Sequence, residues 1–149
     1  MTTDDSSAIP AVDLQSLASL VREVLADDQA EILDCLSTRM PSYGVNPVTS
    51  GIYRFSGTAR SDDVIKPWSL ILKQIQRIDL GERGKGYLND PADWNYWKRE
   101  AYAFQSGILE RSQGGLFPVQ CYAVSEPNVS TVWIWQQDLG DHFVVFCFC

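Results

Sequence analysis

The segment from Gly51 to Lys73 constrains the fold of this chain most, because it places a lysine at the end of an apolar strand. Its pattern predicts two antiparallel strands, residues 52–56 and 68–75. Side chains alternate between the faces of a strand, so Ile71 and Lys73 share one face. An ammonium group on the inner face of a sheet is costly unless an anion meets it. The sequence therefore predicts an anionic partner for Lys73.

Composition bounds the classes of protein to which the chain can belong. Its 149 residues are enough for one domain with a buried core, and 45% hydrophobic residues with five tryptophans argue against disorder. The net charge is −7 and the 12 basic residues form no stripe, so nucleic acid is not an expected partner. No apolar run has the length of a membrane span, and the acidic amino terminus is not a secretory signal. The four cysteines are therefore expected to be reduced thiols in the cytoplasm.

Local patterns predict the elements up to the hairpin. Residues 1–10 are polar and acidic and are expected to be a disordered lead-in. A helix is predicted to begin at Asp13, because apolar residues recur there at helical spacing, namely Leu14, Leu17, Leu20, Val21 and Val24. A strand over residues 31–40 and a loop over residues 41–50 follow. The connection inside the hairpin contains typical turn residues, namely Gly57, Ser61, Asp62, Asp63 and Pro67.

The second half of the chain predicts one helix and two strands. Asp90 can cap a helix over residues 91–109, and Pro91 suits its first position. The buried stripe of this helix is predicted to be Trp97, Ala101, Phe104 and Ile108. Strands over residues 118–125 and 131–136 are separated by a turn at residues 126–128. The predicted fold class is α+β, with a mostly antiparallel five-stranded sheet, one packed helix and an amino-terminal helix.

Glu100 is the predicted partner of Lys73. It lies three residues after Trp97 and four before Phe104, so it borders the buried stripe of its helix. If that helix packs on the sheet, Glu100 and Lys73 can meet and neutralise each other. The alternative is that Lys73 extends toward water at a strand end and Glu100 is solvated. Spacing alone leaves both alternatives open.

Three segments resemble a known family, namely GIYRFSGTAR…PWSLILK, YWKREAYAFQSGIL and TVWIWQQDL. They are similar to the amino-terminal lobe of aminoglycoside/choline-type phosphotransferases, which are small-molecule kinases of the protein-kinase-like superfamily. The resemblance covers residues 31–140. It divides the chain into residues 1–30 (lead-in and helix), a kinase-like lobe over residues 31–140, and an apolar tail over residues 141–149 that is not family sequence.

The resemblance implies that the lobe binds ATP. Lys73 would hold the α- and β-phosphates, Glu100 would orient Lys73, and Ile71 would help to roof the adenine. Trp135 would sit near the gatekeeper position. The hinge that hydrogen-bonds adenine would be the backbone of four residues, namely Gln136, Gln137, Asp138 and Leu139.

The parts of the family that perform the chemistry are not found in this sequence. The single histidine, His142, precedes Phe143, so there is no His-Gly-Asp catalytic loop. The triplet that begins at Asp138 follows the hinge strand directly, without a catalytic loop before it, and is not assigned to magnesium. No catalytic residue and no metal ligand are therefore assigned, although the complete family uses Mg²⁺. The expectation is a truncated phosphotransferase that does not act alone, whose small-molecule acceptor would need a second lobe.

Two other functions stay open on the sequence. The chain can be a non-catalytic binding or interaction module in which Lys73 and Glu100 form a structural pair, or a non-functional gene remnant. Cys147 and Cys149 are a weak metal signal, because two thiolates lack further ligands. Cys35 and Cys121 are predicted to be core cysteines rather than nucleophiles.

Overall fold

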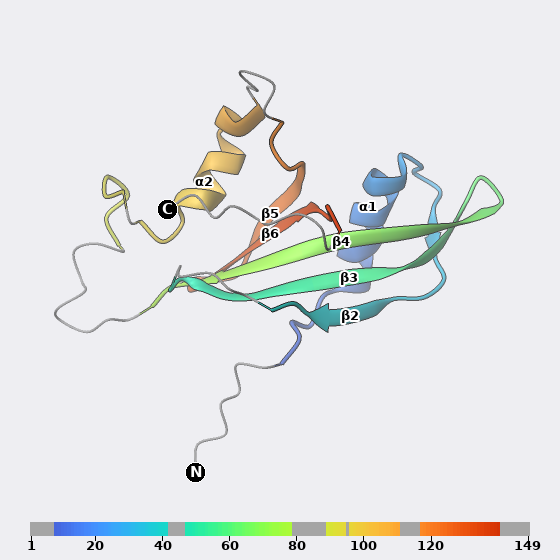
Figure 1. The fold of residues 1–149 in the computed structure, drawn as a ribbon, viewed down its shortest axis with the longest axis horizontal. Helices are drawn as coiled ribbons and strands as arrows, with labels where there is room; N and C mark the ends of the chain where they lie inside the picture. Colours follow the sequence, from blue (N-terminus) through green and yellow to red (C-terminus); the bar gives the residue numbers. More distant parts are fainter. Residues whose placement is uncertain (1–7, 42–46, 79–88, 95, 111–116, 141–149) are drawn as a thin grey trace, which may run out of the picture.

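One antiparallel sheet organises the chain (Figure 1). The computed structural model describes residues 8–41, 47–78, 89–94, 96–110 and 117–140. The sheet in this part of the chain has six strands. Five of them follow the order β1-β3-β4-β6-β5, and the sixth, β2, pairs with β3. The elements are α1 (Leu14–Leu25), β1 (Glu31–Ile32), β2 (Leu36–Arg39), β3 (Thr49–Ser61), β4 (Val64–Gln76), α2 (Arg99–Gln105), the 3₁₀ turn η3 (Ile108–Glu110), β5 (Cys121–Asn128) and β6 (Thr131–Gln137). The α+β class is as predicted, with six strands instead of five.

The β3–β4 hairpin is longer than predicted, and its turn is shorter. Each strand has 13 residues, and only Asp62 and Asp63 lie between them, with φ angles of 51° and 60°. Two consecutive positive φ angles are typical of the tight turn that joins twisted strands. Gly57 and Pro67, which were predicted to lie in the connection, are strand residues. Pro67 is tolerated because β6 pairs only with the later part of β4, from Leu70 onward.

The segment before the hairpin forms a helix and two short strands. Asp13 caps α1, since its carboxylate accepts a hydrogen bond of 2.9 Å from the amide of Ser16. The helix buries Leu17, Leu20 and Val21, whereas Leu14 is exposed. The single strand predicted over residues 31–40 is interrupted, because only residues 31–32 and 36–39 form strands. β1 and β2 pair with successive parts of β3, and the register shifts by one residue between them, where Asp34 accepts a hydrogen bond from the amide of Thr58.

The second helix is much shorter than the predicted span of residues 91–109. Asp90 caps a turn instead, since its side chain binds the amide of Ala92 and its carbonyl binds the amide of Asp93. Tight turns of this kind continue up to α2, which has seven residues. Trp97 and Ala101 are buried as predicted, but Ile108 is exposed.

The last hairpin turns later than predicted. Its turn is formed by Val129 and Ser130, while residues 126–128 belong to β5. The side chain of Asn128 accepts a hydrogen bond of 2.9 Å from the amide of Ser130, which fixes this turn. Glu126 and its neighbours are accommodated because the register of β5 against β6 shifts between Ser125 and Asn128.

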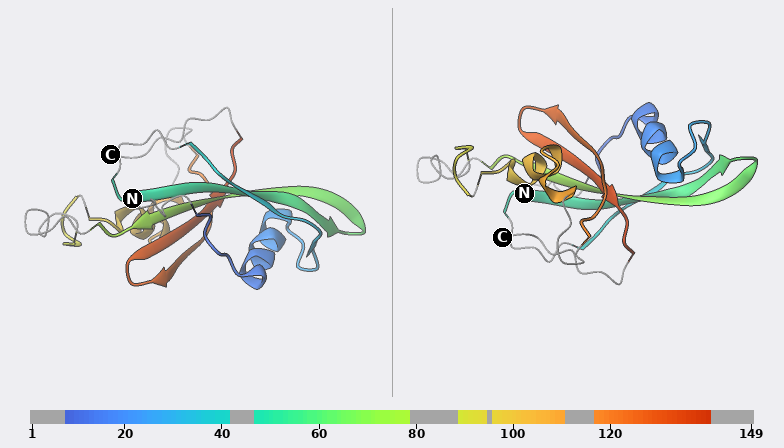
Figure 2. Two further views of the ribbon diagram at one scale, coloured as in Figure 1. Left: turned by 90° about the horizontal axis from the view of Figure 1, so that it is seen from below. Right: turned by 90° about the horizontal axis from the view of Figure 1, so that it is seen from above.

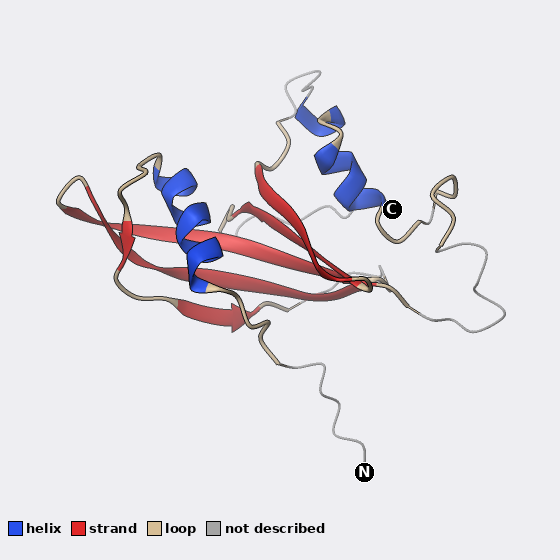
Figure 3. Ribbon diagram, turned by 180° about the vertical axis from the view of Figure 1, so that it is seen from behind, coloured by secondary structure: helices blue, strands red, loops and turns tan. Residues whose placement is uncertain are grey.

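Two apolar clusters occupy the two faces of the sheet. The cluster under α1 consists of Leu17, Leu20, Val21, Tyr53, Phe55, Ala59, Trp68, Leu70, Leu72 and Trp135. The cluster under α2 consists of Val48, Ile75, Trp97, Ala101, Val132 and Ile134. The two helices lie toward opposite ends of the long hairpin, α1 near its turn and α2 near its open end (Figure 3). β5 and β6 cross the hairpin obliquely, which shows the strong twist of the sheet (Figure 2).

No helix in the described ranges combines the length and the apolar composition that a membrane crossing requires.

Candidate functional site

Lys73 lies near the centre of the sheet. Its strand β4 has β3 on one side and β6 on the other, and Lys73 stands opposite Ile52 and Ile134. The residue is only 2% exposed. Because its neighbours across the sheet, Ile52 and Ile134, are apolar, Lys73 needs a charge partner. An isolated buried ammonium group is strongly unfavourable.

Glu100 on α2 supplies that charge partner. The Nζ atom of Lys73 donates a hydrogen bond of 2.5 Å to Oε2 of Glu100. The Glu100 side chain is 31% exposed, so one end of the pair is buried and the other reaches solvent. The seven-residue α2 is held over the sheet by Ala101 and by Trp97, which precedes it. The spacing left two alternatives, an ion pair between Lys73 and Glu100 or solvation of both side chains. The structure shows the ion pair.

Ile71 shares the face of Lys73, as the alternation predicts. Across the sheet it stands opposite Arg54 of β3 and Gln136 of β6. Ile71 and Arg54 are half-buried, whereas Gln136 is 8% exposed. This part of the sheet face is therefore mixed in character, with an apolar residue between polar ones.

Trp135 does not lie beside Lys73. It stands opposite Leu72, and its ring packs edge-on against Phe55, with ring centroids 5.2 Å apart. Both neighbours belong to the cluster under α1. The side chain of Trp135 therefore points to the sheet face opposite Lys73. Gln136 is the residue that β6 presents beside Ile71.

The predicted hinge residues lie where β6 ends. Gln137 is the last residue of the strand, and its amide donates a hydrogen bond of 2.9 Å to the carbonyl of Gln120. Asp138 and Leu139 continue beyond the strand. Gln136 stands opposite Ile71, so the backbone of residues 136–139 leaves the sheet beside Ile71.

The carboxylate of Asp138 joins three parts of the chain. It accepts bonds of 2.8 and 3.2 Å from Arg54, one of 2.8 Å from the amide of Gly140, and another from the hydroxyl of Ser69. Its side chain is 10% exposed. Burial raises the pKa of Asp138, but the hydrogen bonds from Ser69, Gly140 and Arg54 outweigh burial and hold the pKa below its ordinary value of 3.8.

Arg54 and Ser69 were not predicted to belong to the site. A signal was present, because Arg54 alternates with apolar residues on the strand that pairs with β4. The face of a side chain can be read from alternation, but its partner depends on the register between strands.

The lowered pKa of Asp138 makes its contribution to stability depend on pH. The ionised carboxylate contributes fully above 3.8, and the contribution is lost as the pH falls through the lower pKa of the folded state. We expect Asp138→Asn to lower the free energy of unfolding by about 2 kcal/mol near neutral pH. The difference from the wild type should shrink when urea unfolding is repeated from about pH 6 down to about pH 3. A difference that stays constant over this range would contradict the assignment.

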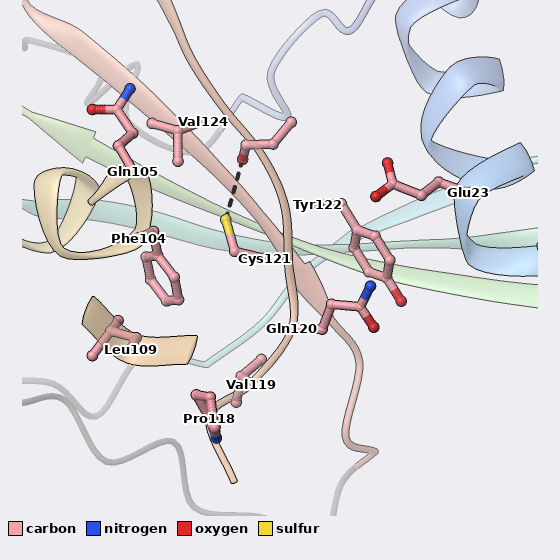
Figure 4. Close-up of a pocket in the computed structure, with 11 residues that line it drawn as sticks. Glu23, Phe104, Gln105, Leu109, Pro118, Val119, Gln120, Cys121, Tyr122 and Val124 are labelled. Carbon is pink, nitrogen blue, oxygen red and sulfur yellow. Dashed lines mark hydrogen bonds between the residues drawn. The ribbon is translucent and has the colours of Figure 1, made fainter. Parts of the chain in front are cut away.

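A cavity of about 460 Å³ lies between α2, β5 and α1 (Figure 4). Phe104 and Leu109 line one side, Glu23 of α1 lines the other, and Cys121 of β5 lies between them. Glu23 is the charged residue among those that line it, so the cavity offers no cation to a phosphate. It includes neither Lys73 nor Glu100.

The two described cysteines differ in exposure. Burial raises the pKa of Cys121 to about 11, so its thiol stays protonated at neutral pH and is a poor nucleophile. Cys35 is exposed, which corrects its prediction as a core residue. Burial of its sulfur and the nearby charge of Asp34 raise the pKa of Cys35 as well.

Metal ligands are not assigned. Within the described ranges, no group of three or more His, Cys, Asp or Glu side chains is placed to hold a metal ion. The predictions for His142, Cys147 and Cys149, and for the apolar tail, lie outside the described residues.

No protein-family model matches the sequence, and neither the curated proteins nor the solved structures contain a match to this chain.

Proposed function

We propose that this chain binds ATP on the sheet face that carries Lys73, as the nucleotide-binding small lobe of a small-molecule phosphotransferase of the protein-kinase-like type. The observation that carries the proposal is the 2.5 Å pair between Lys73 and Glu100. A buried ion pair stabilises a fold poorly, because desolvation offsets most of the attraction between the charges. A lysine kept at the centre of a sheet is therefore better explained by a ligand that needs its charge.

The surroundings of Lys73 suit the other end of a nucleotide. Ile71 offers a half-buried apolar surface two residues away on the same face, where a base can lie. The chain that leaves β6 at residues 136–139 borders that surface and can offer backbone groups to the edge of the base. Because the sequence has no His-Gly-Asp loop, the proposal covers nucleotide binding and does not extend to transfer of a phosphoryl group.

A second candidate is a non-catalytic interaction module in which the Lys73–Glu100 pair is structural. The observation that favours it is the 2% exposure of Lys73, because a phosphate group must reach the ammonium group in order to bind it. Nucleotide affinity separates the two candidates.

The test is calorimetry of the purified chain with ATP, with and without Mg²⁺. We expect saturable binding by the wild type, and an affinity about 10- to 100-fold lower for Lys73→Met, which loses one charged hydrogen-bond donor. Lys66→Met is the matched control. Lys66 lies on the same strand and pairs with Asp62 at the hairpin turn, so its loss should leave ATP affinity unchanged.

Thermal unfolding must first show that both variants are folded. A folded wild-type chain that binds no ATP would rule out the nucleotide site and leave the structural pair. Equal losses in both lysine variants would show that the affinity does not depend on the site at Lys73.

A further inference from the structure

Asp138 holds the chain at the point where β6 ends. The pairing of β6 with both neighbours stops by Gln137, and no strand pairing among the described residues continues beyond it. The side chain of Asp138 takes over, because it is bound by Arg54 of β3 and Ser69 of β4. Its other oxygen accepts the amide of Gly140, which bends the chain at a φ angle of 79°.

We propose that Asp138 is a positioning residue, which ties the segment after β6 to Arg54 and Ser69 and thereby places the backbone that meets the base of the nucleotide. This inference rests on the proposed function and adds to it the residue on which base recognition depends. The geometry of the contacts supports it. Two bonds from one guanidinium group fix both the position and the rotation of a carboxylate, which a single bond does not. Because the carboxylate also binds the amide of Gly140, its position fixes the backbone of residues 138–140.

The two ends of the site are held by different elements. Lys73 is fixed by strand pairing on both sides of β4 and by Glu100, none of which involves Asp138. Ser69 lies four residues before Lys73 on the same strand, a separation of about 13 Å. Loss of the Asp138 contacts should therefore weaken binding of the base and leave binding of the phosphates largely unchanged. A variant that merely loosens the fold would weaken both.

The experiment compares ATP with inorganic tripolyphosphate, which carries the phosphates without the base. Calorimetry should give Asp138→Asn an ATP affinity about tenfold lower than the wild type, the equivalent of about one lost hydrogen bond. Its affinity for tripolyphosphate should change less than about twofold, because the contacts of Lys73 are retained. Asp28→Asn is the matched control, since Asp28 is exposed and distant in sequence from the site.

A second variant covers the case in which Asp138→Asn does not fold. Ser69→Ala removes one hydrogen bond to Asp138 and keeps both from Arg54, so we expect a smaller loss of ATP affinity in the same direction. Parallel losses of ATP and tripolyphosphate affinity, or no loss of either, would overturn the role of Asp138. If the wild type binds neither compound, the nucleotide site itself is wrong. That result is distinct from one in which the wild type binds ATP and the variants keep its affinity.

Discussion

Replacing Glu100 by alanine is expected to lower the free energy of unfolding by about 3 kcal/mol, because it removes the carboxylate that Glu100 places against the buried ammonium group of Lys73. Pairs in which both groups are fully buried lose about 3–5 kcal/mol when one partner is removed. Glu100 is 31% exposed, so water can partly replace its carboxylate and the loss should fall at the lower end of this range. Urea unfolding of the purified variant measures the change.

A second ion pair, between Lys98 and Glu126, is the matched control. Glu126 binds Lys98 at 2.7 Å, but its side chain is 44% exposed, so Glu126→Ala should cost less than about 1 kcal/mol. Lys73→Met should cost little as well, because Glu100 can turn to solvent and methionine fills the apolar row. Combining it with Glu100→Ala should recover most of the loss, since no buried charge then remains. A Glu100→Ala variant as stable as the control would show that Lys73 does not depend on this carboxylate.

Replacing Gly57 by alanine is expected to destabilise the protein by about 3 kcal/mol or more, because the added methyl group has no space. A Cβ atom at this position would lie 2.1 Å from the carbonyl oxygen of Asp34 and 2.9 Å from its carbonyl carbon. Both atoms belong to the backbone that joins β1 to β2 beside β3. Relief of the clash would pull Asp34 away from Thr58, which it binds through both carboxylate oxygens at 2.8 and 2.6 Å.

Gly140→Ala serves as the comparison for this variant. A Cβ atom at Gly140 would meet no atom of the described residues within 4 Å, so the expected cost comes from its φ angle of 79°. We expect about 1 kcal/mol for that strain. Thermal unfolding should therefore rank the wild type first, Gly140→Ala second and Gly57→Ala last. The reverse order of the two variants would mean that β3 does not lie so close to the chain at Asp34.

The fold class could be predicted from the sequence, but several boundaries could not. α1 was found because its apolar residues recur at helical spacing. The connection of the long hairpin was misplaced because Gly57 and Pro67 are usually turn residues. Here Gly57 serves a close approach of two backbones, which depends on contacts between distant segments. The second helix was overextended because a cap at Asp90 and an apolar stripe fit a turn as well as a helix.

The candidate site divides in the same way. The cost of burying one charge on a strand indicated a partner for Lys73, and the sequence offered Glu100 as one of two alternatives. The network around Asp138 could not be predicted, because it joins residues that are 84 and 69 positions apart. Its formation depends on the register of three strands. The face of Trp135 could not be predicted either, because a shift of one position moves a strand side chain to the other face.

The short turn at Asp62 and Asp63 has a consequence for the order in which the protein assembles. A loop of two residues closes with little loss of chain entropy, so the β3–β4 hairpin can form from contacts that are close in sequence. β6 must reach β4 across a much longer stretch, as the bond between Trp133 and Gln74 spans 59 positions. We therefore expect Lys73 to remain hydrated on the early hairpin. Its charge is buried only when β6 and the helix with Glu100 arrive, so the most costly desolvation falls late in folding.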